Sequence, residues 1–238
     1  MKILAIDSSG LVASAALLEE DNLIAEYTVH YKKTHSQTLL PMIDEIVKMT
    51  EMDLNTIDAI AVAKGPGSFT GLRIGAATVK GLGLALDKPV IGVPTVEGLA
   101  MNLYGVDKLI CPLMDARRNQ VYTGIYRFCD DKMVIVKDQT AIGVEELIQA
   151  LNLIGQEVIF LGDGVPVYKE MIKTAIEVPC SFAPAHQNKQ RASAVGARAL
   201  DYFEQGLYDS ADAFEPEYLR MSQAERERME KQKEAVNE

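Results

Sequence analysis

Three observations predict an α/β fold made of two similar lobes. The first is a set of three strand-like segments at the start of the chain, at residues 2–7, 12–18 and 23–31. The second is the alternation of helix-like and strand-like segments that follows, which is typical of a sheet with parallel strands. The third is an imperfect repeat of this order in the second half of the 238-residue chain. A chain of this length holds one large domain or two small ones.

The first half carries the clearer pattern. Turn residues at 8–10 and 19–22 separate the three opening strands, whose residues are apolar or alternate with polar ones. Apolar residues at helical spacing predict a helix over 36–49, with Pro41 early enough to lie in its first turn. The next segments are an apolar strand at 58–63, a helix at 70–86, a strand at 89–93 and a helix at 95–103. This order is that of half an actin-like, ribonuclease-H-like (ASKHA) fold, although fold order alone does not give function.

The second half repeats this order less regularly. It predicts strands at 109–114, 121–128, 133–138 and 157–161, and helices at 143–152, 165–175 and 190–206. Residues 207–219 have no regular pattern. We expect an N-terminal lobe of residues 1–105, a smaller C-terminal lobe of residues 106–220 and a charged tail of residues 221–238. The helix near 190–206 is able to pack back on the first lobe.

The charged tail has almost no apolar residues to bury. Its spacing of acidic and basic residues can support a solvated helix, but a frayed segment is the simpler expectation. We therefore expect folding not to need it, because its removal would take away little hydrophobic stabilisation.

Composition limits the function classes. The net charge of −10 disfavours independent binding to nucleic acid, including tRNA-sized ligands, because affinity for phosphates comes from Lys and Arg. Cys111, Cys129 and Cys180 are far apart and form no C-x-x-C pair, which favours reduced, cytoplasmic thiols. No apolar run reaches the roughly 18 residues of a membrane helix, and Asp7 interrupts an opening run too short for a signal peptide. We expect a cytoplasmic protein that does not contact a membrane.

A glycine-rich loop joins the strand at 58–63 to the helix at 70–86. It reads GPGSFTG over residues 65–71, and a loop in this position can aim backbone N–H groups at a phosphate. The candidate phosphate ligands are Gly65, Gly67 and Ser68, with Arg73 as a further anion-binding residue. The loop lacks the G-K-S/T ending of a P-loop. A tight crossover turn is therefore the favoured alternative, with Thr70 capping the helix and Arg73 clamping the loop.

Weaker signals concern a nucleotide site between the lobes. Asp7 ends the first strand and resembles the Mg²⁺-organising aspartate of actin-like ATPases, but it can instead brace the neighbouring turn. Residues 162–164, GDG, follow a strand where those ATPases carry a glycine motif on the adenosine side. Asp115 and Arg117 lie at a strand end, where α/β proteins collect ligands, and form either a ligand-binding pair or a local salt bridge. A working ATP site needs both halves and a carboxylate-bound metal, so a vestigial site is favoured.

The histidines offer no metal site. His30, His35 and His186 share no metal-ligand spacing, and His35 is expected to be exposed at the start of a helix.

Two motifs resemble the TsaB/TsaD group, the paired proteins that help to make threonylcarbamoyladenosine on tRNA. They are KGPGSFTGLRIG at residues 64–75 and GVPTVEGLA at residues 92–100. The segments MKILAIDSS, THSQTLLPMID, DARRNQVY and YLR also resemble the TsaB branch, so the resemblance covers most of the chain. In the catalytic TsaD branch two histidines separated by three residues hold a metal. Aligned on Glu97 and Gly98, these positions are Thr95 and Leu99, which supply no imidazole.

The resemblance implies a non-catalytic protein that binds TsaD and activates it for threonylcarbamoyl transfer to adenosine 37 of tRNA. It also implies TsaE as a further partner, a homodimer when TsaD is absent, and contact with tRNA only through the complex. It implies no metal and no cofactor in this chain, with room for a nucleotide at the interface of the complex.

The resemblance points to the helices near 36–49 and 70–86 as the partner surface. The second helix contains several glycines, and each interior glycine costs about 1 kcal/mol relative to alanine. Small residues four apart allow close approach of another backbone, either that of a partner helix or that of the chain's own sheet. The expected contact residues are Leu39, Leu40, Ile43, Gly71, Gly75, Thr78 and Leu82.

An independent actin-like ATPase or small-molecule kinase is the alternative function. It requires a complete phosphate site, and the sequence shows a partial one. A metallopeptidase is a third class, and the chain lacks the ligands for it.

Overall fold

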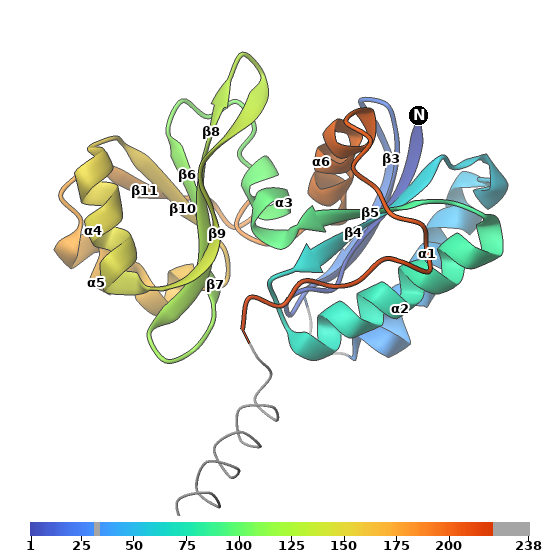
Figure 1. Ribbon diagram of the computed structural model, residues 1–238, viewed down its shortest axis with the longest axis horizontal. Helices are drawn as coiled ribbons and strands as arrows, with labels where there is room; N and C mark the ends of the chain where they lie inside the picture. Colours follow the sequence, from blue (N-terminus) through green and yellow to red (C-terminus); the bar gives the residue numbers. More distant parts are fainter. Residues whose placement is uncertain (31–33, 221–238) are drawn as a thin grey trace, which may run out of the picture.

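The computed structural model describes residues 1–30 and 34–220, which form two α/β lobes, each built on a mixed sheet (Figure 1). The ASKHA fold class predicted from the sequence is confirmed. The charged tail at 221–238 and Tyr31, the last residue of the third expected strand, lie outside the described residues. In the described part of the chain, no helix is both long and apolar enough to cross a membrane.

The first sheet has five strands in the order β3-β2-β1-β4-β5. Their bounds are β1 Lys2–Asp7, β2 Ala13–Glu19, β3 Asn22–Val29, β4 Ala59–Gly65 and β5 Val90–Pro94. The first three strands pair antiparallel, whereas β4 lies parallel to both β1 and β5. A parallel pair needs a crossover, and the chain supplies helices between these strands.

Three helices cover the two faces of this sheet. Helices α1 (His35–Thr50) and α2 (Phe69–Leu86) lie on one face, and α6 (Ala192–Glu204) lies on the other (Figure 1). The alternation of side chains along β1 explains how both faces are filled. Leu4 and Ile6 join the core beneath α1 and α2, and Ile3 and Ala5 pack beneath α6. A short 3-10 helix, Leu54–Thr56, precedes β4.

The second sheet has six strands in the order β11-β10-β6-β8-β7, with β9 paired to β8. Their bounds are β6 Leu109–Pro112, β7 Met114–Asp115, β8 Gln120–Cys129, β9 Lys132–Gly143, β10 Val158–Leu161 and β11 Cys180–Phe182. Helices α4 (Val144–Ile154) and α5 (Val165–Ala175) pack on one face. The buried helix α3 (Thr95–Met101) packs on the other face and also contacts α6, so it joins the lobes.

The structure corrects several expected boundaries. Ser68 rather than Thr70 is the N-cap of α2, because the Ser68 hydroxyl oxygen accepts the Gly71 N–H at 3.3 Å. Strand β9 is longer than the predicted segment at 133–138, since it continues its pairing along most of β8. The short strands β7 and β11 were not predicted; two or three residues give too little alternation to reveal a strand.

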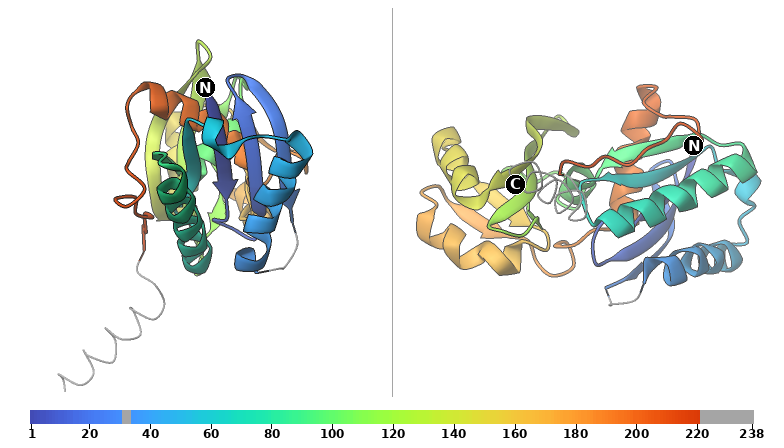
Figure 2. Two further views of the ribbon diagram at one scale, coloured as in Figure 1. Left: turned by 90° about the vertical axis from the view of Figure 1, so that its right-hand side faces the viewer. Right: turned by 60° about the horizontal axis from the view of Figure 1, so that its bottom comes forward.

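The irregular segment that follows α6 crosses the first lobe and ends between the lobes (Figure 2). Asp209 and Val90 exchange backbone hydrogen bonds at 2.9 Å at the edge of β5. Phe214 is fully buried in the core beneath α2, and the Glu217 N–H donates to the Lys64 carbonyl at 2.7 Å. These contacts bring Glu217–Arg220 to the carboxyl ends of the central strands.

Candidate functional site at the lobe interface

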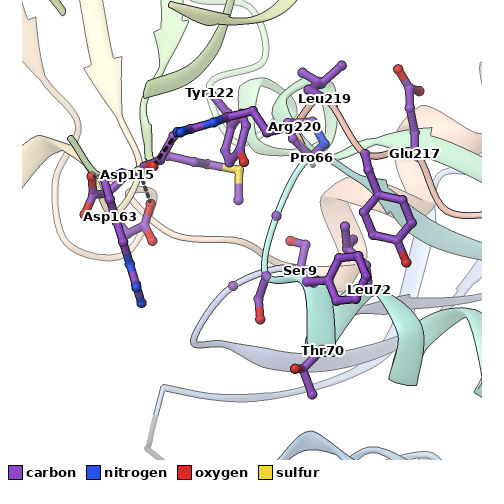
Figure 3. A pocket seen from close by; sticks show the side chains of 18 of the residues that line it. Ser9, Pro66, Thr70, Leu72, Asp115, Tyr122, Asp163, Glu217, Leu219 and Arg220 are labelled. Carbon is purple, nitrogen blue, oxygen red and sulfur yellow. Dashed lines mark hydrogen bonds between the residues drawn. The ribbon is translucent and has the colours of Figure 1, made fainter. Parts of the chain in front are cut away.

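A cavity of about 510 Å³ lies between the two lobes. The first lobe contributes the β1–β2 loop and the glycine-rich loop, and the second lobe contributes the turn after β7 (Figure 3). Residues 217–220 close the cavity from the side of the C-terminal segment. Ligands of α/β proteins collect at such strand ends, so this cavity is the candidate site.

Asp7 braces the β1–β2 loop. Its carboxylate is buried and accepts the Ser9 N–H at 2.8 Å and the Ser9 hydroxyl at 2.6 Å. Burial raises its pKa from 3.8 to about 6, although the hydrogen bonds from Ser9 act in the opposite direction. Ser9 and Gly10 line the cavity and Asp7 does not. Asp7 therefore holds the loop and is not placed as a ligand.

His35 is also tied to this loop. Its Nε2 lies 2.8 Å from the Gly10 carbonyl oxygen, and the side chain is half-buried. The expectation of an exposed histidine at the helix start was wrong, because the β1–β2 loop covers the first turn of α1.

The glycine-rich loop is packed against the β1–β2 loop. A Cβ atom at Gly67 would collide with the Ser9 carbonyl oxygen, and one at Gly71 would collide with that of Ser8. The Ser68 N–H donates to the Ser9 carbonyl at 2.6 Å. The Gly71 N–H is held by the Ser68 hydroxyl. Two N–H groups suited to a phosphate are thus bonded within the chain, which supports the tight crossover turn.

Two other members of the expected phosphate set have structural explanations. Gly65 has a φ of 126°, which favours glycine, and a Cβ atom there would collide with the Glu217 carbonyl oxygen. Arg73 is exposed on α2, and its guanidinium lies 4.0 Å from the centre of the Phe69 ring. Arg73 does not line the cavity, so it is not placed to hold an anion there.

Asp115, Arg117 and Asp163 lie together on the second-lobe side of the cavity. Asp115 accepts the Arg117 backbone N–H at 2.8 Å and the Tyr168 hydroxyl at 3.0 Å. Asp163 accepts the Asp115 N–H at 3.2 Å, and burial raises the pKa of its carboxyl. Among the described residues Asp115 and Arg117 form no salt bridge between their side chains. These carboxylates suit hydroxyl groups better than phosphates.

The C-terminal segment is the part of the site that the sequence analysis missed. Arg220 donates to the Ala116 carbonyl of the second lobe at 2.8 Å. Tyr218 packs against Phe69 with tilted rings whose centres are 4.7 Å apart, and Glu217 forms an ion pair of 3.3 Å with Lys64. Residues 207–219 carry no periodic pattern. The one available signal was the YLR motif at 218–220.

Helix α3 holds the two positions that the resemblance described above aligns with the histidines of the catalytic branch. Thr95 and Leu99 are fully buried there. Between them, Glu97 accepts the Arg198 Nε at 2.7 Å and the Tyr202 hydroxyl at 2.9 Å. Within residues 1–30 and 34–220, no three His, Cys, Asp or Glu side chains gather in a group that could hold a metal. The donor set around α3 therefore does not fit the metal of the catalytic branch.

The expected partner residues divide into two groups. Leu39 and Ile43 are buried in the core, and Gly71 and Gly75 are buried against Ser8. Assigning these four to a free surface was wrong, because the chain's own sheet and loop already contact them. Leu40 is 53% exposed, and Thr78 and Leu82 are half-buried. Only these three of the seven remain available for a partner.

Comparisons with known proteins identify the family. A family model named TsaD, tRNA N6-adenosine threonylcarbamoyltransferase, matches residues 22–228. The Bacillus subtilis tRNA threonylcarbamoyladenosine biosynthesis protein TsaB is 35% identical over 98% of this chain and 100% of its own length.

Solved structures agree with this assignment. YeaZ from Pseudomonas aeruginosa has a TM-score of 0.80 and 28% identity, and the match covers 92% of this chain and 99% of that one. The ROK hexokinase from Thermus thermophilus has a TM-score of 0.50 and 12% identity, covering 87% of this chain and 100% of that one, and shows the shared fold alone. The chain therefore belongs to the TsaB family of tRNA threonylcarbamoyladenosine biosynthesis proteins, within the wider TsaD family.

Proposed function

We propose that this protein is a non-catalytic partner that binds TsaD and activates it for threonylcarbamoyl transfer to adenosine 37 of tRNA. The chemistry of α3 carries the non-catalytic part of the proposal, and the family membership supports the partnership with TsaD. Thr95 and Leu99 stand where the catalytic branch has its histidines, and neither can ligate a transition metal. The Glu97–Arg198 pair instead ties this helix to α6.

The interlobe cavity supports the same proposal. Its glycine-rich loop bonds to the β1–β2 loop, and its buried aspartate bonds to Ser9. The backbone N–H groups of the loop would be needed to bind a phosphate, and the Asp7 carboxylate would be needed to bind a magnesium ion, but both already form hydrogen bonds within the chain. We expect any nucleotide to bind at the interface of the complex, with Ser9, Asp115 and Arg117 as the residues of this chain that could reach it.

The partner surface is proposed on the outer side of α1 and α2. Leu40, Thr78 and Leu82 are its accessible members, and Leu84 on α2 is 64% exposed. A stable protein interface buries about 1,600 Å² in total, so these side chains would be its centre and not its whole extent.

When TsaD is absent, a homodimer would cover the same apolar side chains. TsaE would be a further partner, tRNA would be reached only through the complex, and the protein would work in the cytoplasm.

An independent actin-like ATPase or small-molecule kinase remains the second candidate. The observation in its favour is the open cavity with Asp115 and Asp163 at its edge. Titration of the isolated chain with ATP and magnesium in a calorimeter separates the two candidates. The proposal predicts no binding at micromolar nucleotide.

The direct test is reconstitution. Threonylcarbamoyladenosine formation on tRNA is measured with an activated threonylcarbamoyl donor, ATP, and TsaD and TsaE from the same source, with and without this chain. We expect a large loss of product when this chain is left out and no product from this chain alone. Product formation by the chain alone, or full activity without it, would contradict the proposal.

A further inference from the structure

A second groove is lined by residues of both lobes near the N-terminus and the β8–β9 turn. The N-terminus and this turn lie at the top of Figure 1. The groove has a volume of about 880 Å³. The β2–β3 turn, the end of α3, the β8–β9 turn and α6 contribute its walls. It shares no lining residue with the cavity at Ser9 and Arg220.

The lining of this groove is mixed, and its apolar part is called the floor here. Leu18, Met101, Met133 and Leu200 line it from both lobes, and Leu23 beside them is 44% exposed. Tyr104 is 55% exposed and stands edge-on to Phe128, with ring centres 5.0 Å apart. Large apolar side chains that gather in one exposed groove are typical of a contact surface.

The rim is acidic. Glu20 and Asp21 come from the β2–β3 turn, Asp131 from the β8–β9 turn, and Asp201 and Glu204 from α6. Among the described residues, Asp21, Asp131 and Glu204 have no ion-pair partner.

Three carboxylates of the rim raise the pKa of the same tyrosine hydroxyl. The pKa of the Tyr104 hydroxyl is raised by burial, and then by the charges of Asp131, Asp21 and Asp201. Two cationic groups come from residues that line the groove: the Arg191 Nε donates to Glu26 at 3.0 Å, and the Met1 ammonium pairs with Glu20 at 3.6 Å. The rim therefore presents unbalanced negative charge from both lobes around an apolar floor.

We propose that this acidic groove docks a basic amphipathic segment of another protein, with apolar side chains on the floor and lysines or arginines at the rim. Charge complementarity of this kind steers association and fixes orientation. An amphipathic helix in an apolar groove is a recurring recognition mode.

Other occupants fit less well. A second copy of this chain fits this groove less well, because its net charge of −10 does not favour an approach to acidic side chains. A calcium ion needs six to eight oxygens at about 2.3–2.6 Å, and among the described residues no three His, Cys, Asp or Glu side chains gather in a group that could hold a metal.

The test uses the full-length protein and a labelled synthetic helical peptide with leucines on one face and lysines on the other. Binding is measured by fluorescence anisotropy. Asp21→Lys/Glu204→Lys reverses two rim charges, and Asp138→Lys/Glu177→Lys makes the same charge change at exposed positions of the second lobe. We expect at least tenfold weaker binding to the rim variant and less than twofold change in the control. Equal weakening in both would show general charge attraction and overturn the proposal.

Two further measurements do not depend on how the variants fold. A peptide with serines in place of leucines should bind the wild-type protein at least tenfold more weakly, and equal binding would rule out the apolar floor. A photo-crosslinker in place of one leucine should label Met101, Tyr104 or Met133. Labelling at the Ser9–Arg220 cavity, or calcium binding that only the rim variant abolishes, would also overturn the proposal.

Discussion

Gly75 of α2 lies against Ser8 of the β1–β2 loop, so that a Cβ atom at position 75 would stand 2.6 Å from the Ser8 hydroxyl oxygen. That hydroxyl donates to the Gly71 carbonyl at 2.9 Å. The face of α2 that carries Gly71 and Gly75 is thus covered by the chain's own β1–β2 loop. Intramolecular packing therefore explains these two glycines, and a partner helix is not needed to explain them.

Gly75→Leu should lower the free energy of unfolding by about 1–3 kcal/mol, because the new side chain overpacks a filled site. Gly81 is the matched control, since a Cβ atom there has nothing within 4 Å. Gly81→Leu should stabilise the helix by up to about 1 kcal/mol. Urea unfolding measures both. A Gly75→Leu protein as stable as the wild type would show that the face is free.

The ion pair between α3 and α6 should matter for stability. Glu97 and Arg198 have side chains only 6% and 9% exposed. Glu97→Ala should cost about 3–5 kcal/mol, because it leaves a buried guanidinium with one partner fewer. Lys173→Ala breaks the exposed pair with Glu170 and should change stability by less than about 1 kcal/mol. Similar urea midpoints for the two variants would contradict the role given to Glu97.

The pH dependence of stability should carry a contribution from Asp7. Its pKa is about 6 in the folded protein and near its ordinary value of 3.8 in the unfolded chain. The folded state therefore holds this proton more tightly, and stability from this group is lost as the pH rises from about 4 to about 6. A pKa difference of about two between the folded and unfolded states corresponds to a change of about 3 kcal/mol in the free energy of unfolding.

Asp7→Asn should remove this dependence. The stability difference between Asp7→Asn and the wild type is measured by urea unfolding at pH 4 and pH 7. We expect the difference to shift in favour of the variant at pH 7. A difference that stays constant between the two pH values would show that Asp7 titrates normally.

The C-terminal segment should stabilise the fold mainly through one buried ring. Phe214 is 1% exposed in the core, whereas Tyr218 is 38% exposed on Phe69. Phe214→Ala should cost about 3–5 kcal/mol through the cavity it leaves. Tyr218→Ala should cost about 0.5–1.5 kcal/mol, the contribution of an aromatic pair. Equal melting temperatures for Phe214→Ala and Tyr218→Ala would show that the segment is not anchored at Phe214.

The sequence predicted the fold better than the site, for physical reasons. The periodic apolar residues of α1 show which face of the helix is buried, and the continuous apolar run of β1 shows that both faces of the strand are buried. A glycine in α2 allows either a partner or the chain's own loop to approach closely, and the sequence is the same in both cases. Nothing local in residues 207–219 shows that they cross between lobes, because Phe214 and Arg220 find their contacts far away in the chain.

The central claim is that this chain binds TsaD through the outer side of α1 and α2. The most direct measurement is the mass of the complex formed with TsaD from the same source, by light scattering. Leu40→Glu changes an exposed residue of α1, and Leu153→Glu makes the same change on α4, where the leucine is 88% exposed. The account predicts a complex for the wild type and Leu153→Glu, and at least tenfold weaker association for Leu40→Glu. No complex with the wild-type chain, or an unchanged complex with Leu40→Glu, would contradict it.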